Sequence, residues 1–322
     1  MQAVRITAHG GPEVLEVADL PAPGPGPGEV LVDVAAAGVN FIDTYVRSGL
    51  YPTALPAVLG QEGAGTVRSV GDGVDDVAVG DVVAWAGGEG SYAQQCVKKA
   101  GEVVVVPAGV EPALAAAVML QGMTAQYLTT STFALGAGHR CLVHAGAGGV
   151  GLLLIQLAKR AGAEVFTTVG GPQKAELARA AGADHVVDYR AEDFGAAIEA
   201  IAGPKPLDVV YDGVGKETFL RGLDLLRPRG TMVTFGNASG PPDPIAPLVL
   251  TQKGSLFLTR PSLGHYVATT AELRHRAGEV LGLVASGGLD VRVGLRLPLA
   301  RAREAHEALE GRRTTGKVLL EP

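Results

Sequence analysis

One short loop restricts the fold of this chain more than any other stretch. In "RCLVHAGAGGVGLLLIQLAKRAGA", Gly146, Gly148 and Gly151 follow the spacing G-x-G-x-x-G between an apolar strand-like run and a long apolar helix-like run. There the first glycine permits a tight turn, the second lets the backbone approach a pyrophosphate, and the third lets helix and strand pack closely. Gly149 and Val150 belong to the same loop, where the start of the helix offers N–H donors. The loop predicts a dinucleotide-binding site.

The residues around this loop alternate between strand-like and helix-like runs. The strand-like runs are "RCLVHA", "AEVFTTVGG", "DHVVDY", "LDVVYDGV", "GTMVTFG" and "GSLFLT", and helical patterns such as "AELARAAGA" and "ETFLRGLDLL" lie between them. Such alternation implies an α/β fold with a mostly parallel, doubly wound sheet of the Rossmann type. We place this domain at residues 122–263, beginning within a stretch of helical spacing at 112–135.

The first 120 residues follow a different pattern. Short strand-like runs such as "VLVDVAAAGV", "GDVVAWAG" and "GEVVVVP" are separated by turns rich in Gly and Pro, which predicts a β-rich module with little helix. After about residue 263, two amphipathic helical patterns flank "LRLPLA" and do not continue the strand–helix alternation. We therefore expect a discontinuous β-rich domain, residues 1–121 and 264–322, that supplies the substrate-binding part.

The second strand of the α/β domain ends without the acid that many dinucleotide sites contain. A binder of NAD places Asp or Glu there to hold the ribose 2′-hydroxyl, whereas this chain has "TTVGGPQKAE". An acid would repel a 2′-phosphate; the small Gly170 leaves room for one, and Lys174 can supply the positive charge. The stretch favours NADPH over NADH, with Tyr189 and Arg312 as further candidates for the same pocket.

The residue types that bind zinc are missing from the positions where they would be expected. "LPAVLGQEGAGTV" resembles the zinc-binding G-H-E stretch of medium-chain alcohol dehydrogenases but has Gln61 in place of its histidine. The same resemblance implies a cysteine near "AAGVNFID", where this chain has Asn40. Gln and Asn are poor zinc ligands, and the two cysteines of the chain, Cys96 and Cys141, are too few for a structural zinc site. We expect no metal site.

Composition narrows the range of partners. The 27 basic and 33 acidic residues are mixed along the chain and give a net charge of −6, which argues against nucleic acid as a partner. No apolar run is long enough for a membrane span, and the first residues lack the pattern of a signal peptide. We expect a soluble, cytoplasmic protein.

Several stretches resemble the zinc-independent branch of the medium-chain dehydrogenase/reductase superfamily, the NADPH:quinone oxidoreductases that include zeta-crystallin. They are "GGPEVLEV", "GVNFIDTYVRSGLYP", "HAGAGGVGLLLIQLAK", "VTFGNASG", "GSLFLTRPSL" and "EGRRTTGKVLL". Together they are most similar to the bacterial quinone reductase subgroup. The resemblance covers nearly the whole chain and implies a GroES-like domain beside the Rossmann domain, with NADPH bound between the two domains, in a homodimer.

The resemblance also assigns roles to individual positions. Asn40, Asp43 and Tyr45 correspond to residues that line the nicotinamide end and the substrate cleft, and Tyr45 is a candidate proton donor or a wall of the cleft. The implied cofactor contacts fall into three groups: Thr124 at the domain junction; Gly170, Lys174, Tyr189 and Arg312 around the 2′-phosphate; and Phe235, Gly236, Asn237, Phe257 and Arg260 along the far wall of the nicotinamide pocket, with Asn40 opposite.

Taken together, these features predict reduction of a quinone by NADPH without a metal, since a quinone stabilises the developing charge on its own carbonyl oxygen. An NADPH-dependent alkenal or enone reductase and a non-catalytic NADPH-binding protein are the alternatives. The apolar, β-prone "GSLFLT" is expected to be an uncovered sheet edge that pairs with a second copy of the chain in a symmetric dimer.

Overall fold

The chain leaves its first folding unit and returns to it near the C-terminus. In the computed structural model, which describes residues 1–322, the β-rich unit comprises Met1–Met123 and Val267–Pro322, and the α/β unit comprises Thr124–Tyr266. The boundaries expected from the sequence, after residues 121 and 263, fall inside helices α2 (Pro112–Tyr127) and α8 (Leu263–Tyr266). A pattern of apolar residues does not mark the point at which a continuous helix passes from one unit into the next.

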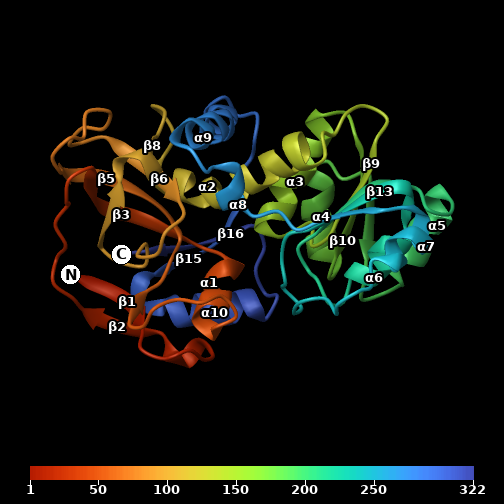
Figure 1. Cartoon of the computed structure of the whole chain (residues 1–322), viewed down its shortest axis with the longest axis horizontal. Coiled ribbons are helices and arrows are strands. Elements are labelled where there is room, and N and C mark those ends of the chain that lie inside the picture. Colours follow the sequence, from red (N-terminus) through yellow and green to blue (C-terminus); the bar gives the residue numbers. More distant parts are fainter. The chain divides into compact units, whose positions relative to one another are not determined.

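The α/β unit is built on six strands that all run parallel, in the order β11-β10-β9-β12-β13-β14. Strands β9, β10 and β13 of this sheet are labelled in Figure 1. This arrangement confirms the expected doubly wound α/β fold class. The strands are β9 (Arg140–Val143), β10 (Glu164–Val169), β11 (His185–Asp188), β12 (Leu207–Asp212), β13 (Leu226–Thr234) and β14 (Phe257–Thr259).

Helices connect these strands and pack on the sheet. Helix α3 packs beside α4 over β9, β10 and β11, while α5 packs beside α6, and α7 contacts β13. Their bounds are α3 (Gly149–Arg160), α4 (Pro172–Ala180), α5 (Phe194–Ala202), α6 (Phe219–Asp224) and α7 (Leu248–Gly254). Leu142, Phe166 and Val210 of the sheet and Ile198 and Leu223 of the helices form one buried core. Burial of these side chains is the main source of stability of the unit.

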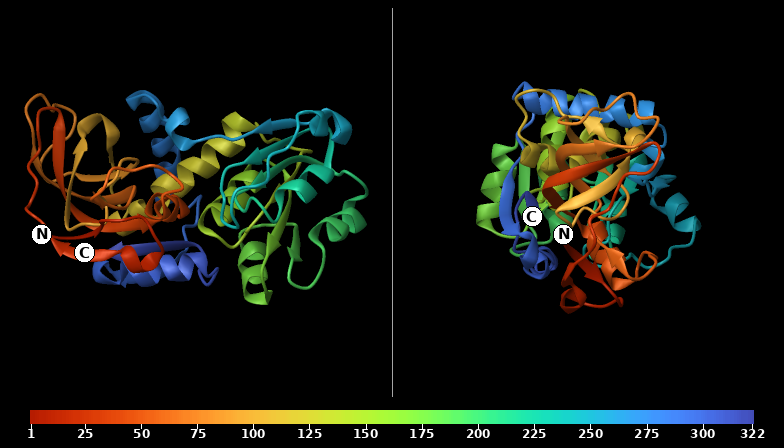
Figure 2. Two further views of the ribbon diagram at one scale, coloured as in Figure 1. Left: turned by 60° about the horizontal axis from the view of Figure 1, so that its bottom comes forward. Right: turned by 90° about the vertical axis from the view of Figure 1, so that its left-hand side faces the viewer.

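The β-rich unit contains two sheets (Figure 2). The larger has the order β15-β16-β3-β5-β6-β8, with β7 also paired to β3, and the smaller has the order β2-β1-β4. The C-terminal strand β16 pairs antiparallel with β3, which places both chain termini in this unit. The elements are β1 (Gln2–Ile6), β2 (Glu16–Asp19), β3 (Glu29–Val39), α1 (Phe41–Ser48), β4 (Ala57–Val58), β5 (Glu62–Val70), β6 (Val82–Ala86), β7 (Gln95–Lys99), β8 (Val104–Val105), α9 (Thr270–Ala285), β15 (Val293–Pro298), α10 (Ala302–Glu310) and β16 (Lys317–Glu321).

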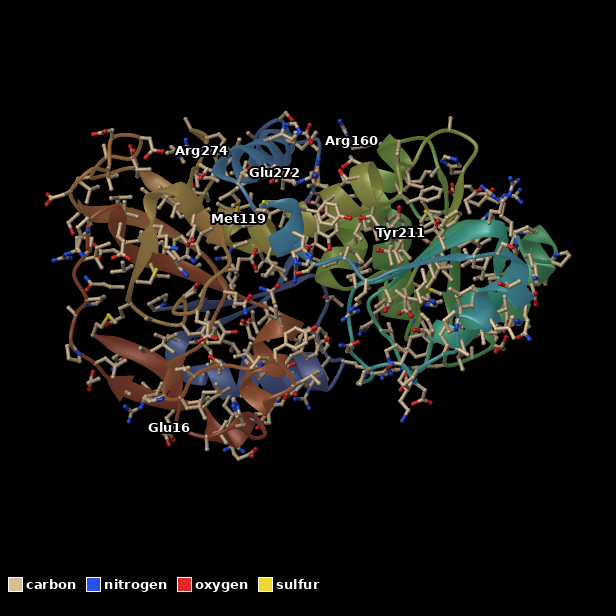
Figure 3. The ribbon with its side chains drawn as sticks, in the orientation of Figure 1. Glu16, Met119, Arg160, Tyr211, Glu272 and Arg274 are labelled. Atoms are coloured by element: carbon tan, nitrogen blue, oxygen red, sulfur yellow. The ribbon has the colours of Figure 1, made fainter.

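Two local features differ from the sequence-based expectation. Helix α1 was not expected in the β-rich module. The sequence has a helical pattern at 112–135, but the α-helix ends at Tyr127 and is followed by a π-helical turn, Leu128–Thr132. Thr129 and Thr130 donate their hydroxyl protons to the Ala125 and Gln126 carbonyls, and such side-chain bonds compete with the regular helix ladder. Tyr211, labelled in Figure 3, donates from β12 to the Leu128 carbonyl at 3.2 Å.

No helix of either unit combines the length and the apolar character that crossing a membrane requires.

Candidate active site

The glycine loop forms a tight turn between β9 and α3. A Cβ on Gly146 would lie 2.0 Å from Thr167 Oγ1, and a Cβ on Gly151 would lie 2.3 Å from the Ala145 carbonyl oxygen. Both positions therefore exclude any side chain. Gly148 caps α3, whose first N–H groups, beginning with those of Gly149 and Val150, have no partner within the helix. These N–H groups and the positive end of the helix dipole suit a pyrophosphate, so the loop fits the predicted group.

At the end of β10 the backbone turns sharply toward α4. Gly171 adopts φ +106°, a conformation that favours glycine, and Pro172 follows as the first helical residue. The Asp188 carboxylate accepts hydrogen bonds from the Gly171 and Arg190 N–H groups at 3.0 and 3.1 Å, which holds this turn against the end of β11. Lys174 lies in the first turn of α4, half-buried.

Three of the four residues expected around the 2′-phosphate, Gly170, Lys174 and Tyr189, thus lie at the carboxyl end of the α/β sheet. Val169 pairs with Asp188, so Gly170 and Tyr189 directly follow the carboxyl ends of neighbouring strands. A Cβ on Gly170 would lie 2.6 Å from Tyr189 Oη. Arg312 belongs to the β-rich unit, where it follows α10 with φ +55°.

The stretch 235–237 follows the carboxyl end of β13 and is held by Arg260. Arg260 Nη1 donates to the Gly236 carbonyl at 3.0 Å and to Thr234 Oγ1 at 3.3 Å, and its guanidinium also faces the Asn237 amide. Phe235 packs its ring against Gly213. The structure therefore brings Phe235, Gly236, Asn237 and Arg260 together.

Phe257 and Thr124 are placed differently from that group. Phe257 pairs with Thr231, three residues before the end of β13, and its side chain is 63% exposed on the edge strand β14. Thr124 is buried within α2, at the first residue of the α/β unit. The sheet geometry thus separates Phe257 from Arg260, although the two are close in sequence.

Asn40 caps helix α1 and is buried, with an exposed fraction of 4%. Its Oδ1 accepts from Lys317 Nζ at 2.8 Å and from Gln121 Nε2 at 3.1 Å. Its Nδ2 donates to Glu62 Oε2 at 2.7 Å and to the Gly38 carbonyl at 3.3 Å. A side-chain amide has two acceptor and two donor positions. All four are occupied by the protein itself.

Behind Asn40 lies a buried ion pair between Lys317 and Glu62. Both side chains are buried, and Lys317 Nζ donates to Glu62 Oε2. The second carboxylate oxygen, Glu62 Oε1, accepts the Leu120 N–H of α2 at 2.7 Å. Burial lowers the pKa of Lys317, and the Glu62 carboxylate opposes that shift. The pair joins β5, β16 and α2, and its ammonium is the positive charge beside Asn40.

Asp43 begins a chain of buried polar groups. Its Oδ2 accepts from the Asn40 N–H at 2.8 Å and from the Tyr92 hydroxyl at 2.9 Å, while its Oδ1 is buried without a partner. Tyr92 lies 3.2 Å from His306 Nε2, and His306 Nδ1 lies 3.0 Å from Arg47 Nη1. Because Arg47 can only donate, Nδ1 is the acceptor and Nε2 carries the proton.

Burial is the largest cause of the pKa shifts of Asp43 and His306 in this series of polar groups. It raises the pKa of Asp43 to about 7, although hydrogen bonds from Asn40 and Tyr92 lower it. It lowers the pKa of His306 to about 3, and the nearby Arg47 guanidinium adds to that shift. Arg47 is paired with Glu310 at 2.7 Å, which connects the chain to the surface of α10.

Tyr45, the third predicted catalytic residue, lies on the half-exposed side of α1. Its ring is edge-on to Tyr51, with centroids 5.4 Å apart, and 6.2 Å from that of Phe41. The three rings form an aromatic cluster that is partly open, unlike Asn40 and Asp43. Such a surface suits contact with a planar ring.

Sequence reasoning missed several of these groups. Glu62, Tyr92, Lys317 and His306 carry no local signal, because their partners are far away in the chain. Helix α1 does have one: Asn40 followed three residues later by an acid is close to a capping box, and the Asp43 carboxylate accepts the Asn40 N–H. No group of three or more His, Cys, Asp or Glu side chains is placed to hold a metal ion.

Comparison with known proteins agrees with this architecture. Residues 26–136 match the family model described as "Alcohol dehydrogenase GroES-like domain", and residues 149–285 match "Zinc-binding dehydrogenase". The chain is 46% identical to a quinone oxidoreductase of Pseudomonas aeruginosa, over 99% of both chains. It superposes with a TM-score of 0.98 on the Escherichia coli quinone oxidoreductase complexed with NADPH, at 44% identity and full coverage of both chains. A 2-haloacrylate reductase of Burkholderia sp. is 39% identical, over 100% of this chain and 99% of its own.

A GroES-like module combined with a doubly wound dinucleotide fold defines a medium-chain dehydrogenase/reductase, as the sequence predicts. Within that superfamily the chain belongs to the family of the bacterial quinone oxidoreductases.

Proposed function

We propose that this protein is an NADPH:quinone oxidoreductase. The observation that carries the proposal is the residue at the end of β10. Gly170 stands there instead of the acid of an NAD site, and Lys174 and Tyr189 lie at the same carboxyl end of the sheet. This arrangement suits a 2′-phosphate and disfavours the unphosphorylated cofactor. The full-length similarity to quinone oxidoreductases, one of them complexed with NADPH, supports both the cofactor and the reaction.

Each part of the cofactor has residues suited to it. The glycine loop and the first N–H groups of α3 hold the pyrophosphate; Gly170, Lys174, Tyr189 and Arg312 hold the 2′-phosphate end. Phe235, Gly236, Asn237 and Arg260 form a wall at the nicotinamide end, and Thr124 completes the cofactor contacts. Phe257 is proposed to lie at the margin of this wall, because its side chain is largely exposed on the edge strand β14.

Bound NADPH would supply the reducing equivalents, and the residues of the chain orient the reactants and exclude water. The half-exposed aromatic cluster of Phe41, Tyr45 and Tyr51 offers aromatic ring faces and edges for contact with a quinone ring. Asn40 and Asp43 are buried, so we propose that they act by holding the start of α1, which carries Tyr45. The reaction is proposed to be independent of zinc, since Gln61 and the fully engaged Asn40 occupy the positions of metal ligands.

A second reaction is favoured by one specific comparison. The 39% identity to a 2-haloacrylate reductase supports reduction of an activated carbon–carbon double bond as the alternative. Initial rates of NADPH oxidation with a panel of quinones and a matched panel of enals and haloacrylates separate the two. We expect kcat/KM for the best quinone to exceed that for the best enal by at least about tenfold. The reverse order would assign the enzyme to double-bond reduction, and no oxidation with either panel would favour a non-catalytic NADPH-binding protein.

The proposal includes a homodimer formed through β14. This strand lies at the edge of the six-stranded sheet and exposes Phe257 by 63% and Leu258 by 39%. An apolar strand edge of this kind tends to pair with another chain. A cytoplasmic location is also proposed, with Cys96 and Cys141 both free thiols, as is usual for a reducing compartment.

A further inference from the structure

The position where a binder of NAD has its acidic side chain is filled by two other side chains. A Cβ on Gly170 would lie 2.6 Å from Tyr189 Oη and 3.1 Å from Arg190 Nε. A Cβ on Gly171 would lie 3.8 Å from Arg190 Nη1. The Arg190 guanidinium therefore lies over the Gly170–Gly171 turn. A side chain at position 170 would have to displace the ends of these two side chains.

The backbone holds Arg190 in this place. Asp188 Oδ1 accepts from both the Gly171 and the Arg190 N–H groups, so the turn after β10 and the turn after β11 share one carboxylate oxygen. Arg190 itself is exposed and takes part in no ion pair. Its Nε and Nη1 lie beside the Gly170–Gly171 turn, and its side-chain N–H groups form no ion pair with Asp188 or with any other carboxylate.

We propose that Arg190 is a specificity-determining residue for NADPH, whose guanidinium donates to the adenosine 2′-phosphate. This inference rests on the proposed function. A guanidinium presents a planar fork that matches phosphate oxygens, which an ammonium such as that of Lys174 does not. Gly170 has the complementary role, because its missing side chain leaves space for Tyr189 and Arg190 to reach the phosphate.

The test uses ligands that contain the adenosine end alone. Binding of adenosine 2′,5′-bisphosphate and of adenosine 5′-monophosphate is measured by calorimetry for the wild type, Arg190→Gln, Arg190→Lys and the control Arg179→Gln. Arg179 lies at the far end of α4 and is exposed, so the control removes the same charge from the same region. Thermal unfolding verifies that each variant folds.

For Arg190→Gln we expect the Kd of the bisphosphate to rise about 10- to 100-fold, with the Kd of the monophosphate changed less than about twofold. Arg190→Lys should fall between wild type and Arg190→Gln, and Arg179→Gln should leave both constants near those of the wild type. An equal loss for both ligands in Arg190→Gln would assign the guanidinium to the adenine ring and overturn the proposal. An unchanged Kd for the bisphosphate would overturn it as well.

The same titrations separate this inference from the proposed function. If the wild type binds both ligands equally, the preference for NADPH fails together with the role of Arg190. If the wild type prefers the bisphosphate, loses that preference in Arg190→Gln, and reduces no quinone, the reaction assignment fails while the role of Arg190 is supported.

Discussion

Two buried titratable residues in the β-rich unit change the stability of the protein with pH in opposite directions. Asp43 and His306 are linked through Tyr92 and share its hydroxyl group. Burial shifts both groups toward their neutral forms, but the carboxyl is neutral when protonated and the imidazole when deprotonated. The folded state therefore retains a proton on Asp43 and rejects one on His306 over overlapping ranges of pH.

The signs of the two pH dependences are opposite. The pKa of Asp43 rises from 3.8 to about 7 on folding, so its contribution is complete below about pH 4 and is lost as the pH rises through 7. The pKa of His306 falls from 6.5 to about 3, so its contribution is present above pH 6.5 and is lost as the pH falls toward 3. In the wild type the two largely cancel between about pH 4 and 6.5.

Single substitutions should reveal the pH dependence of stability that each residue contributes. In Asp43→Asn, whose side chain resembles the protonated acid, the free energy of unfolding should rise with pH between about 4 and 6.5. In His306→Gln it should fall with rising pH from about 4 to 7. Urea denaturation at a series of pH values measures both slopes. Slopes equal to that of the wild type in both variants would contradict the assigned protonation states.

At the scale of the elements, α1 depends on residues that the chain supplies from far away. Asn40 starts the helix, and its amide is fixed by Lys317 of β16, Glu62 of β5 and Gln121 of α2. A buried ion pair stabilises little in itself, but removing one partner leaves an uncompensated charge. The network therefore makes the geometry of α1 conditional on the return of the C-terminal strand.

Lys317→Met should destabilise the protein by about 3–5 kcal/mol, because Glu62 is then buried without its counter-charge. The double variant Glu62→Gln/Lys317→Met should recover part of that loss, since no charge is left unpaired. The amide oxygen of the new glutamine can still accept from the Leu120 N–H, while its nitrogen replaces the acceptor of Asn40 Nδ2 and limits the recovery. Urea denaturation gives the coupling between the two sites. A double variant no more stable than Lys317→Met would contradict this account.

The elements also show how far the sequence alone could lead. The parallel sheet was predictable because most of its strands contain a short apolar run, and β9 to β12 are each followed by a turn and a helix, as in "RCLVHAGAGGVG". Lys317 and Glu62 are 255 residues apart, and nothing local indicates that either is buried. Arg190 was missed for the opposite reason: an exposed arginine after a strand is ordinary, and only the geometry at Gly170 distinguishes it.

At the scale of the whole molecule, we expect the edge strand β14 to form the interface of the proposed dimer. Scattering or light scattering at micromolar protein should give the mass of a dimer. Leu258→Lys should shift that mass toward the monomer, because a charge on an apolar strand edge opposes pairing. Val79→Lys, at an exposed apolar residue of the β-rich unit, is the matched control and should remain dimeric. A monomeric wild type would remove the dimer from the proposal.

The central claim is that this chain uses NADPH to reduce quinones, and kcat/KM for 1,4-benzoquinone with NADPH and with NADH tests it most directly. For the wild type we predict a preference for NADPH. For Lys174→Ala we predict that this preference falls about tenfold or more, since the variant lacks the ammonium that we propose to pair with the 2′-phosphate. Equal use of the two cofactors by the wild type would contradict the account.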